Sequence, residues 1–280
     1  MSKVMRLDKF LSEMGIASRK ETREYAKKGR IKVNNAIVKV SDYKIDAEKD
    51  IVTFDGRTIA YEQFEYYMLN KPAGVVSATV DNNDRTVIDL IDSERKKDLF
   101  PVGRLDKDTV GLLIITNDGE LAHSLLSPVK HIDKKYFARV EGIITEEHIK
   151  RFKEGLKLKD GTLTKPAQLE IIKSGNDKSD NVKSDNPKSE NDKSDNPKSD
   201  NLKSNNEKSD NISEVEITIC EGKYHQIKRM IACVGGKVIY LKRLSMGSLK
   251  LDENLREGEY RRLTEEEIKC LRNGNGEQYD

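Results

Sequence analysis

The chain has 280 residues, of which 36% are charged and 35% hydrophobic, and its formal net charge is +2. This length is enough for one or two domains with a hydrophobic core. No run of about 18 apolar residues is present, so we expect no membrane-spanning helix, and the first residues lack the apolar core of a signal peptide. The three cysteines and four histidines lack metal-ligand spacing. We therefore expect a cytoplasmic protein with reduced thiols and no bound metal.

The first 60 residues predict a small α+β module. Apolar residues at helical spacing indicate a first helix that contains Leu7, Phe10, Leu11 and Met14. Ser18 and Glu21 form a capping-box pattern for a second helix, Arg19–Lys28, and Gly29 suits its C-terminal end. Short strands are expected around the turn pairs Asn34-Asn35 and Asp55-Gly56, at Ile31–Val33, Ile37–Val40, Ile51–Phe54 and Thr58–Ala60.

This module is strongly basic, since residues 1–40 carry eleven Lys or Arg and only four acidic side chains. A compact cationic surface favours a polyanionic partner, most simply a nucleic acid, although a solvated helix surface would have a similar composition. The pattern from Met5 to Asn34 resembles the S4 RNA-binding domain. That resemblance implies RNA contacts by Arg6, Lys9, Ser18, Arg19, Lys20, Arg23, Lys27, Lys28, Arg30 and Lys32.

Beyond residue 62, many short strands alternate with few helices, which predicts an α+β domain with a mixed, largely antiparallel sheet and flanking helices. Strands are expected at Tyr66–Leu69, Leu99–Val102, Leu112–Thr116, Lys134–Val140, Ala167–Ile172, Val215–Cys220 and Lys237–Leu241. Helices are expected at Thr86–Ile91, at Glu120–Leu126, after Thr145, at Gln226–Val234, and after a capping box at Thr264–Glu267. We thus divide the chain into residues 1–62, a larger domain at 63–273, and a flexible tail at 274–280.

A repetitive segment interrupts the larger domain. From Asn176 to Asp210, the pentad Asn-x-Lys-Ser-acid repeats seven times, with Asn205 in place of the acid once. The repeat is almost devoid of apolar residues and its charges nearly cancel, so it cannot bury a core. We expect residues 174–213 to be a disordered insertion that joins two strands. An electrostatic tether is the functional alternative, and composition alone would support it.

One carboxylate stands out for its setting. Asp106 ends the segment Val102-Gly103-Arg104-Leu105-Asp106, which precedes Thr109, Gly111 and a buried strand. Arg104 and Lys107 flank it, and a carboxylate held among cations on a rigid strand edge stays ionised, as a nucleophile requires. On its own, the segment is more typical of a structural turn with an ion pair.

Two further segments change this interpretation. Lys134-Lys135-Tyr136 leads into a strand and places an aromatic ring there, although an isolated strand tyrosine is commonly structural. Glu221–Met230 places Lys223, His225, Lys228 and Arg229 at a strand-to-helix junction, a pattern typical of phosphate binding at a helix start or of an exposed basic face.

Together the three segments resemble the pseudouridine synthases, specifically the bacterial rRNA enzymes that couple an S4 domain to this catalytic domain. The resemblance runs from about Met5 to Glu267, and Asn70-Lys71-Pro72-Ala73-Gly74 matches the first motif of the family. It implies that Asp106 is the nucleophile and that Tyr136 stacks on a uracil base flipped out of the RNA. Lys228 or Arg229 would hold Asp106 ionised, and both alternatives stay open.

The same resemblance implies further RNA contacts by Lys71, Arg104, Lys223, His225 and Gln226. An isomerisation has no redox step, so no cofactor or metal is expected. Attack by Asp106 on the base and attack on C1′ of the ribose are both compatible with the sequence. We expect a monomer.

The motifs also favour one branch of this family. Tyr224-His225-Gln226 and Leu163–Ala167 resemble the small-subunit branch, which modifies a single uridine of 16S rRNA, of the uridine-516 type. The expected partner is therefore 16S rRNA or the assembling small ribosomal subunit. The same chemistry on 23S rRNA is the nearer alternative, and a non-catalytic S4-type ribosome-binding protein is the more distant one.

Overall fold

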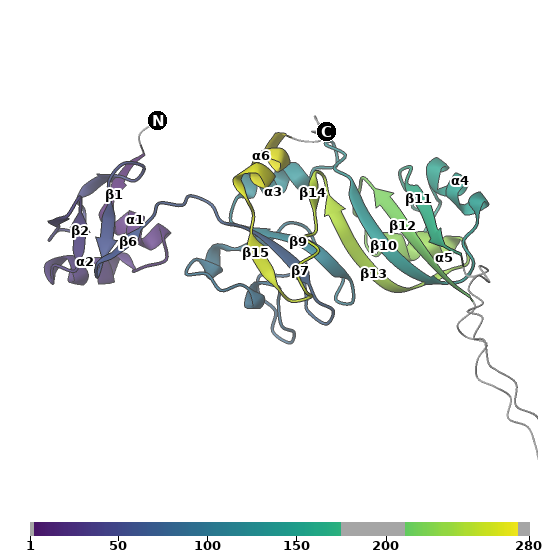
Figure 1. Cartoon of the computed structure of the whole chain (residues 1–280), viewed down its shortest axis with the longest axis horizontal. Coiled ribbons are helices and arrows are strands. Elements are labelled where there is room, and N and C mark those ends of the chain that lie inside the picture. The colour runs from purple at the N-terminus through teal and green to yellow at the C-terminus, as the bar shows by residue number, and fades with distance from the viewer. Residues whose placement is uncertain (1–2, 175–210, 274–280) are drawn as a thin grey trace, which may run out of the picture. The chain divides into compact units, whose positions relative to one another are not determined.

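The computed structural model describes residues 3–174 and 211–273, and Figure 1 shows the order of their elements. The chain divides into two compact units, which are described separately. The first contains Met1–Ile132 and Ser245–Asp280, and the second contains Asp133–Leu244. Within the described residues, no helix is long and apolar enough to cross a membrane.

The first unit begins with the small basic module that the sequence predicted. Its helices are α1 (Leu7–Glu13) and α2 (Arg19–Lys27), and its strands are β1 (Val4–Arg6), β2 (Ile31–Val33), β3 (Ala36–Ile37), β4 (Lys44–Asp46), β5 (Val52–Phe54) and β6 (Arg57–Ile59). β3-β2-β5-β6 form one sheet, and β1 pairs with β4. The Ser18–Glu21 capping box is present, so the predicted start of the second helix is confirmed. The pair β1–β4 was not predicted, because it joins two short segments that are far apart in the sequence, and such pairing leaves no local signal.

The rest of the first unit is built on a buried antiparallel sheet. Its elements are β7 (Tyr66–Lys71), η1 (Ile88–Leu90), η2 (Lys96–Asp98), β8 (Phe100–Pro101), β9 (Val110–Thr116), α3 (Gly119–Leu126), β14 (Leu249–Lys250), β15 (Tyr260–Arg262) and α6 (Glu265–Asn273). β7 pairs with β9 and β15, and β8 pairs with β9. Every residue of β7 and β9 is buried, so these two strands form a rigid base for the loops that leave them. The helix predicted at Thr86–Ile91 is only the short 3₁₀ turn η1.

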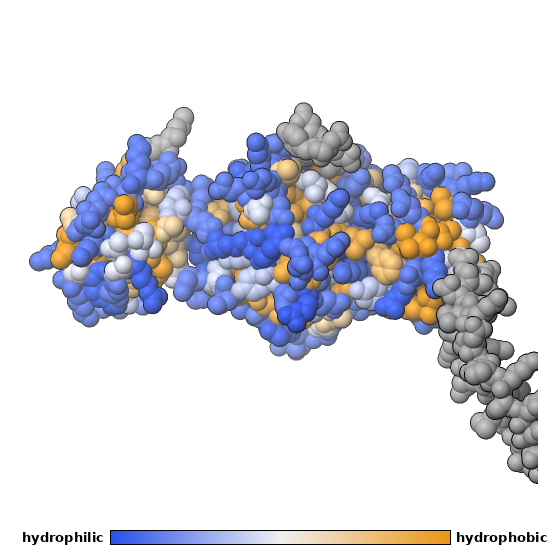
Figure 2. Space-filling model, viewed as in Figure 1, coloured by the Kyte–Doolittle hydropathy of each residue, from blue (hydrophilic) through white to orange (hydrophobic). Residues whose placement is uncertain are grey.

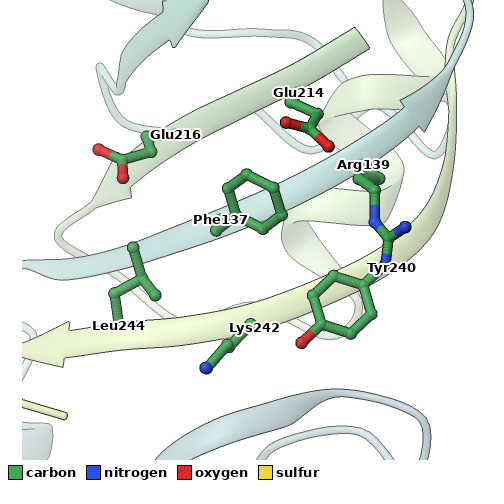
Figure 3. Close-up of a pocket in the computed structure, with 7 residues that line it drawn as sticks. All are labelled: Phe137, Arg139, Glu214, Glu216, Tyr240, Lys242 and Leu244. Carbon is green, nitrogen blue, oxygen red and sulfur yellow. The ribbon is translucent and has the colours of Figure 1, made fainter. Parts of the chain in front are cut away.

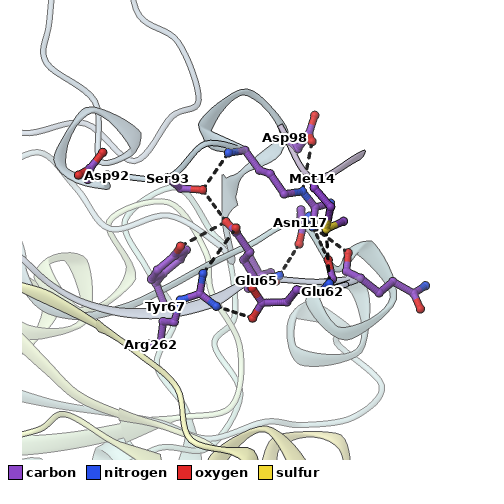
Figure 4. Close-up of polar contacts among 12 residues, drawn as sticks. Met14, Glu62, Glu65, Tyr67, Asp92, Ser93, Asp98, Asn117 and Arg262 are labelled. Carbon is purple, nitrogen blue, oxygen red and sulfur yellow. Dashed lines mark hydrogen bonds and ion pairs between the residues drawn. The ribbon is translucent and has the colours of Figure 1, made fainter. Parts of the chain in front are cut away.

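A buried carboxylate fixes the entry into β7 (Figure 4). Glu65 accepts hydrogen bonds from the Ser93 hydroxyl at 2.7 Å and the Tyr67 hydroxyl at 3.2 Å. Its backbone N–H donates to Asn117, and its carbonyl accepts from the Thr116 hydroxyl at 2.6 Å. Because a buried charged group is costly unless it is hydrogen-bonded, this set of partners holds the strand start in one position.

The second unit has the element order strand–helix–strand–strand–helix–strand. Its elements are β10 (Lys134–Glu141), α4 (Glu146–Glu154), β11 (Gln168–Lys173), β12 (Ile212–Ile219), α5 (Gln226–Cys233) and β13 (Lys237–Met246), the last of which continues into the first unit. The strand order in this unit is β11-β12-β10-β13. The α+β class with a mainly antiparallel sheet is confirmed.

The predicted insertion, residues 174–213, is too long at its C-terminal end. Ile212 and Ser213 belong to β12, where Ser213 is buried and pairs with Val140 of β10. Residues 175–210, which include the whole pentad repeat, and the tail at 274–280 lie outside the described residues. Figure 2 shows that most of the visible surface is hydrophilic, as the charged fraction of the sequence implies.

After α4, the backbone at Gly155 passes very close to the backbone at Thr164, whereas Gly161 has no such neighbour. Gly155 and Gly161 share a φ of +84°, but a Cβ on Gly155 would lie 2.6 Å from the Thr164 carbonyl oxygen, whereas a Cβ on Gly161 meets nothing within 4 Å. We predict that Gly161→Ala costs about 1–2 kcal/mol of unfolding free energy, from backbone strain alone. Gly155→Ala should cost ~1–3 kcal/mol more. Urea unfolding of both variants measures this difference, and equal costs would contradict the close approach.

Candidate active site

The loop that carries Asp106 is held by backbone hydrogen bonds. The Thr109 N–H donates to the Asp106 carbonyl at 3.1 Å, and the Gly74 N–H donates to the Lys107 carbonyl at 2.8 Å. The second bond ties the loop to the turn that follows β7. Asp106 itself is half-buried, so its carboxylate sits on a restrained segment that retains access to solvent.

Ser77 restrains the residue directly before Asp106. Its hydroxyl donates to the Leu105 carbonyl at 2.9 Å and accepts from the Leu105 N–H at 3.1 Å. Ser77 and Leu105 are both buried. Ser77 could not be predicted from the sequence, because a lone serine far from the motif carries no recognisable signal.

Lys71 forms the strongest restraint on this loop. Its side chain is fully buried at the end of β7, and its ammonium donates to the carbonyls of Pro72 at 2.9 Å, Thr109 at 2.9 Å and Lys107 at 3.3 Å. Burial lowers the pKa of Lys71 to about 8, against the opposing effect of nearby acidic groups, Asp106 among them. This placement corrects the expectation that Lys71 is an exposed RNA contact.

The cations beside Asp106 have different positions. Lys107 is exposed, and its ammonium pairs with Asp84 at 2.6 Å, so it belongs to an ion pair on the loop surface. Arg104 is exposed, as an RNA contact requires.

Gly103 has a φ of +78°, and a Cβ there would lie 2.9 Å from the Leu126 side chain. The motif therefore needs glycine at this position for the turn that leads to Asp106.

In the second unit, Tyr136 lies on the covered face of β10. It is only 7% exposed and is directly opposite Ile217 of β12. Lys134 points to the same face of β10 and is also buried. Its pKa is lowered mainly by this burial and secondly by the nearby positive charge of Arg243. Arg243 is itself 2% exposed. Two buried cations thus belong to the same unit as Tyr136, and the sequence analysis had not recognised Arg243.

The segment before α5 is organised around a buried amide. The Gln226 side chain donates to Glu221 at 2.7 Å and accepts from the Lys223 N–H at 2.9 Å, and only 3% of Gln226 is exposed. This corrects the expectation that Gln226 contacts RNA, because both ends of its amide serve the turn. The Lys223 ammonium donates to the Leu163 carbonyl at 2.6 Å and lies 3.2 Å from Glu221.

His225 begins α5 with a left-handed backbone, at a φ of +47°. Its ring stacks on Tyr224 at a centroid distance of 3.8 Å, and 76% of Tyr224 is exposed. Non-glycine residues in this conformation are uncommon and are concentrated at functional sites. The pair places two adjacent aromatic rings at the surface of the unit.

The two candidate cations of α5 differ in their surroundings. Arg229 forms an ion pair with Asp160 at 2.5 Å and also donates to the Tyr224 carbonyl. Lys228 is half-buried on the same helix. The Arg229 guanidinium is thus already engaged by a carboxylate other than Asp106.

The predicted RNA contacts of the basic module fall into two groups. Arg6, Lys9 and Arg30 form ion pairs with Asp8, Glu13 and Asp55, and Ser18 is engaged as the cap of α2. The other predicted cations are exposed, and within the described part of the chain none of them takes part in an ion pair; they are Arg19, Lys20, Arg23, Lys27, Lys28 and Lys32. Arg19, Arg23 and Lys27 lie four residues apart on α2, which places three unneutralised cations on one helix face.

Comparison with known proteins identifies the two regions. Residues 65–233 match the RNA pseudouridylate synthase family, and residues 5–52 match the S4 domain. The chain belongs to the RNA pseudouridylate synthase family. Members of this family are isomerases that act on RNA, and the predicted fold and enzyme class are thereby confirmed.

Full-length relatives support this assignment. An uncharacterized RNA pseudouridine synthase of Bacillus subtilis is 41% identical over 95% of this chain and 98% of its own length. The ribosomal small subunit pseudouridine synthase A of Vibrio cholerae is 37% identical over 95% of this chain and 99% of its own length. Among solved structures, a pseudouridylate synthase crystal structure has a TM-score of 0.59 at 32% identity and covers 95% of this chain.

The buried ammonium of Lys71 predicts a pH-dependent contribution to stability. Its folded pKa of about 8 lies below the ordinary value of 10.5, so between these values the unfolded chain binds the proton and the folded chain does not. Wild type should therefore gain stability relative to Lys71→Met as pH rises through this window, by at most ~1.4 kcal/mol per pH unit, with a constant difference below pH 8.

Urea unfolding at several pH values between 7 and 10.5 measures this difference. Lys97→Met is the matched control, because Lys97 is exposed, and its difference from wild type should not change with pH. A difference for Lys71→Met that is equally flat would show that the Lys71 ammonium is not desolvated in the fold.

Proposed function

We propose that this chain converts a single uridine of 16S rRNA, of the uridine-516 type, to pseudouridine, with Asp106 as the nucleophile. The observation that carries the proposal is the loop around Asp106, where buried Lys71 and Ser77 restrain the backbone while Asp106 itself remains partly exposed. A catalytic group held by its surroundings is positioned for reaction before substrate arrives.

The chemistry needs no external reactant. The bond between N1 of uracil and C1′ breaks, a bond between C5 and C1′ forms, and the proton on C5 is exchanged for one on N1. The base must leave the helix stack for this to happen, so we propose that the uridine is flipped into the protein. Tyr136 would stack on the flipped base and assist removal of the C5 proton, and Lys228 would keep the Asp106 carboxylate ionised.

Two features support 16S rRNA as the substrate. Several relatives that match over nearly their whole length are named ribosomal small subunit pseudouridine synthase A. The Tyr224-His225-Gln226 block is the part of the sequence that favours the same branch. The exposed cations of α2 would bind the phosphate backbone near the target, and Arg104 would contact RNA beside the flipped base. The alternative is the same chemistry on 23S rRNA.

Replacing the nucleophile tests the proposal directly. We predict that Asp106→Asn lowers kcat for pseudouridine formation in purified 16S rRNA by at least about 10³-fold, because the amide cannot attack. Asp108→Asn is the matched control, since Asp108 is an exposed carboxylate two residues away on the same loop. Release of tritium from C5-labelled uridine measures the rate. An active Asp106→Asn enzyme would contradict the assignment, and equal rates on 23S rRNA would contradict the substrate.

The choice between the two cations of α5 has its own test. We predict that Lys228→Gln lowers kcat by about 10- to 100-fold, the effect of one lost charge-assisted hydrogen bond, and that Arg229→Gln lowers it less. The opposite order of the two variants would assign the role elsewhere.

A further inference from the structure

The second unit has one sheet face that its own helices leave open. Its element order and the strand order β11-β12-β10-β13 place both crossover helices behind a four-stranded antiparallel sheet. α5 packs on the covered face, since a Cβ on Gly236 would collide with Ile231 of this helix and with Val140 of β10. One common RNA-binding module uses a four-stranded sheet whose open-face aromatic residues stack on two or three unpaired bases.

The strand register identifies the side chains of the open face. Tyr136, Ala138 and Val140 of β10 are buried, so the alternate residues Phe137 and Arg139 point the other way. Phe137 is directly opposite Glu216 of β12, and Arg139 is directly opposite Glu214. Figure 3 shows these side chains on the same face of the sheet as Tyr240 and Lys242 of β13.

These side chains form a shallow hollow of about 480 Å³, within the range of small-ligand sites. The rings of Phe137 and Tyr240 lie 6.2 Å apart at 64°, and the Arg139 guanidinium lies 4.8 Å from the centre of the Tyr240 ring. All three groups are at least partly exposed. Aromatic rings and a stacked arginine offer flat surfaces to a nucleobase.

The charges of the hollow fit nucleotides better than a duplex. Glu216 is paired with Lys135, whereas Arg139 and Lys242 form no ion pair with any described residue. Two such cations suffice for one or two phosphates, but a duplex backbone needs a longer basic stripe. Glu214 can accept hydrogen bonds from the amino group of an unpaired base.

We propose that this open face binds one or two unpaired nucleotides of the RNA substrate by stacking on Tyr240 and Phe137, with Arg139 and Lys242 on the phosphates. The surface would be a contact in addition to the basic module and the Asp106 loop. The proposal rests on RNA being the substrate and is independent of which uridine is modified.

Binding of a short RNA to the full-length chain tests the proposal. The probe is a fluorescein-labelled, unstructured eight-nucleotide RNA followed by fluorescence anisotropy. Tyr240→Leu should weaken its affinity roughly 5- to 100-fold through loss of one stacked base, whereas Tyr240→Phe, which keeps the ring, should bind like wild type. Ile239→Ala is the matched control, because Ile239 is the exposed neighbour on the opposite face of β13 and should not affect binding.

Two further measurements test the same proposal in case the Tyr240→Leu variant does not fold. Arg139→Gln changes an exposed side chain and should weaken binding without lowering the melting temperature. Photocrosslinking of a 4-thiouridine version of the probe should label the peptides of β10 and β13 that contain Phe137 and Tyr240. Unchanged affinity in the folded Arg139→Gln variant, together with crosslinks confined to other segments, would overturn the proposal and leave this face to a protein partner. An enzyme that proves specific for 23S rRNA would leave these expectations intact.

Discussion

A buried ammonium group determines the geometry of the candidate active site. Lys71 has no exposed surface, and its three hydrogen bonds go to backbone carbonyls, two of them on the loop after Asp106. Burying a cation is unfavourable, and this burial lowers the pKa of Lys71 to about 8. The three hydrogen bonds offset part of that cost, and they hold the loop after Asp106 in one position.

The segment before α5 follows the same principle. Glu221 and Gln226 bond to each other and to the backbone of Lys165 and Lys223, and so fix the turn from which His225 and Lys228 follow. In both places a polar residue of a conspicuous motif restrains the chain by bonding to its backbone. A motif of this kind therefore contains residues that position the chain, in addition to those proposed to touch the substrate.

Sequence reasoning predicted the fold well where local chemistry determines structure. The capping box at Ser18, the Asn34-Asn35 turn and the long strands β10 and β12 have strong local signals. It missed the pair β1–β4, and it misplaced the end of the insertion, where β12 begins earlier than its apolar residues suggest. These boundaries depend on pairing with distant strands, which no local pattern contains.

For the site, the sequence could supply residue types but not their surroundings. Lys71 and Gln226 lie in basic or polar motifs and were predicted to bind RNA, yet both are buried. The partner of Arg229, Asp160, lies about 70 residues away in the chain, so their ion pair could not be anticipated. That ion pair is the contact that disfavours Arg229 as the cation proposed to serve Asp106.

The central claim is that Asp106 makes one pseudouridine in 16S rRNA. Mapping of pseudouridines in the rRNA of a strain that lacks this gene, complemented with wild type or with Asp106→Asn, tests it most directly. We predict that one 16S position loses its pseudouridine, that wild type restores it, and that Asp106→Asn does not. Loss at a 23S position instead, or restoration by Asp106→Asn, would contradict it.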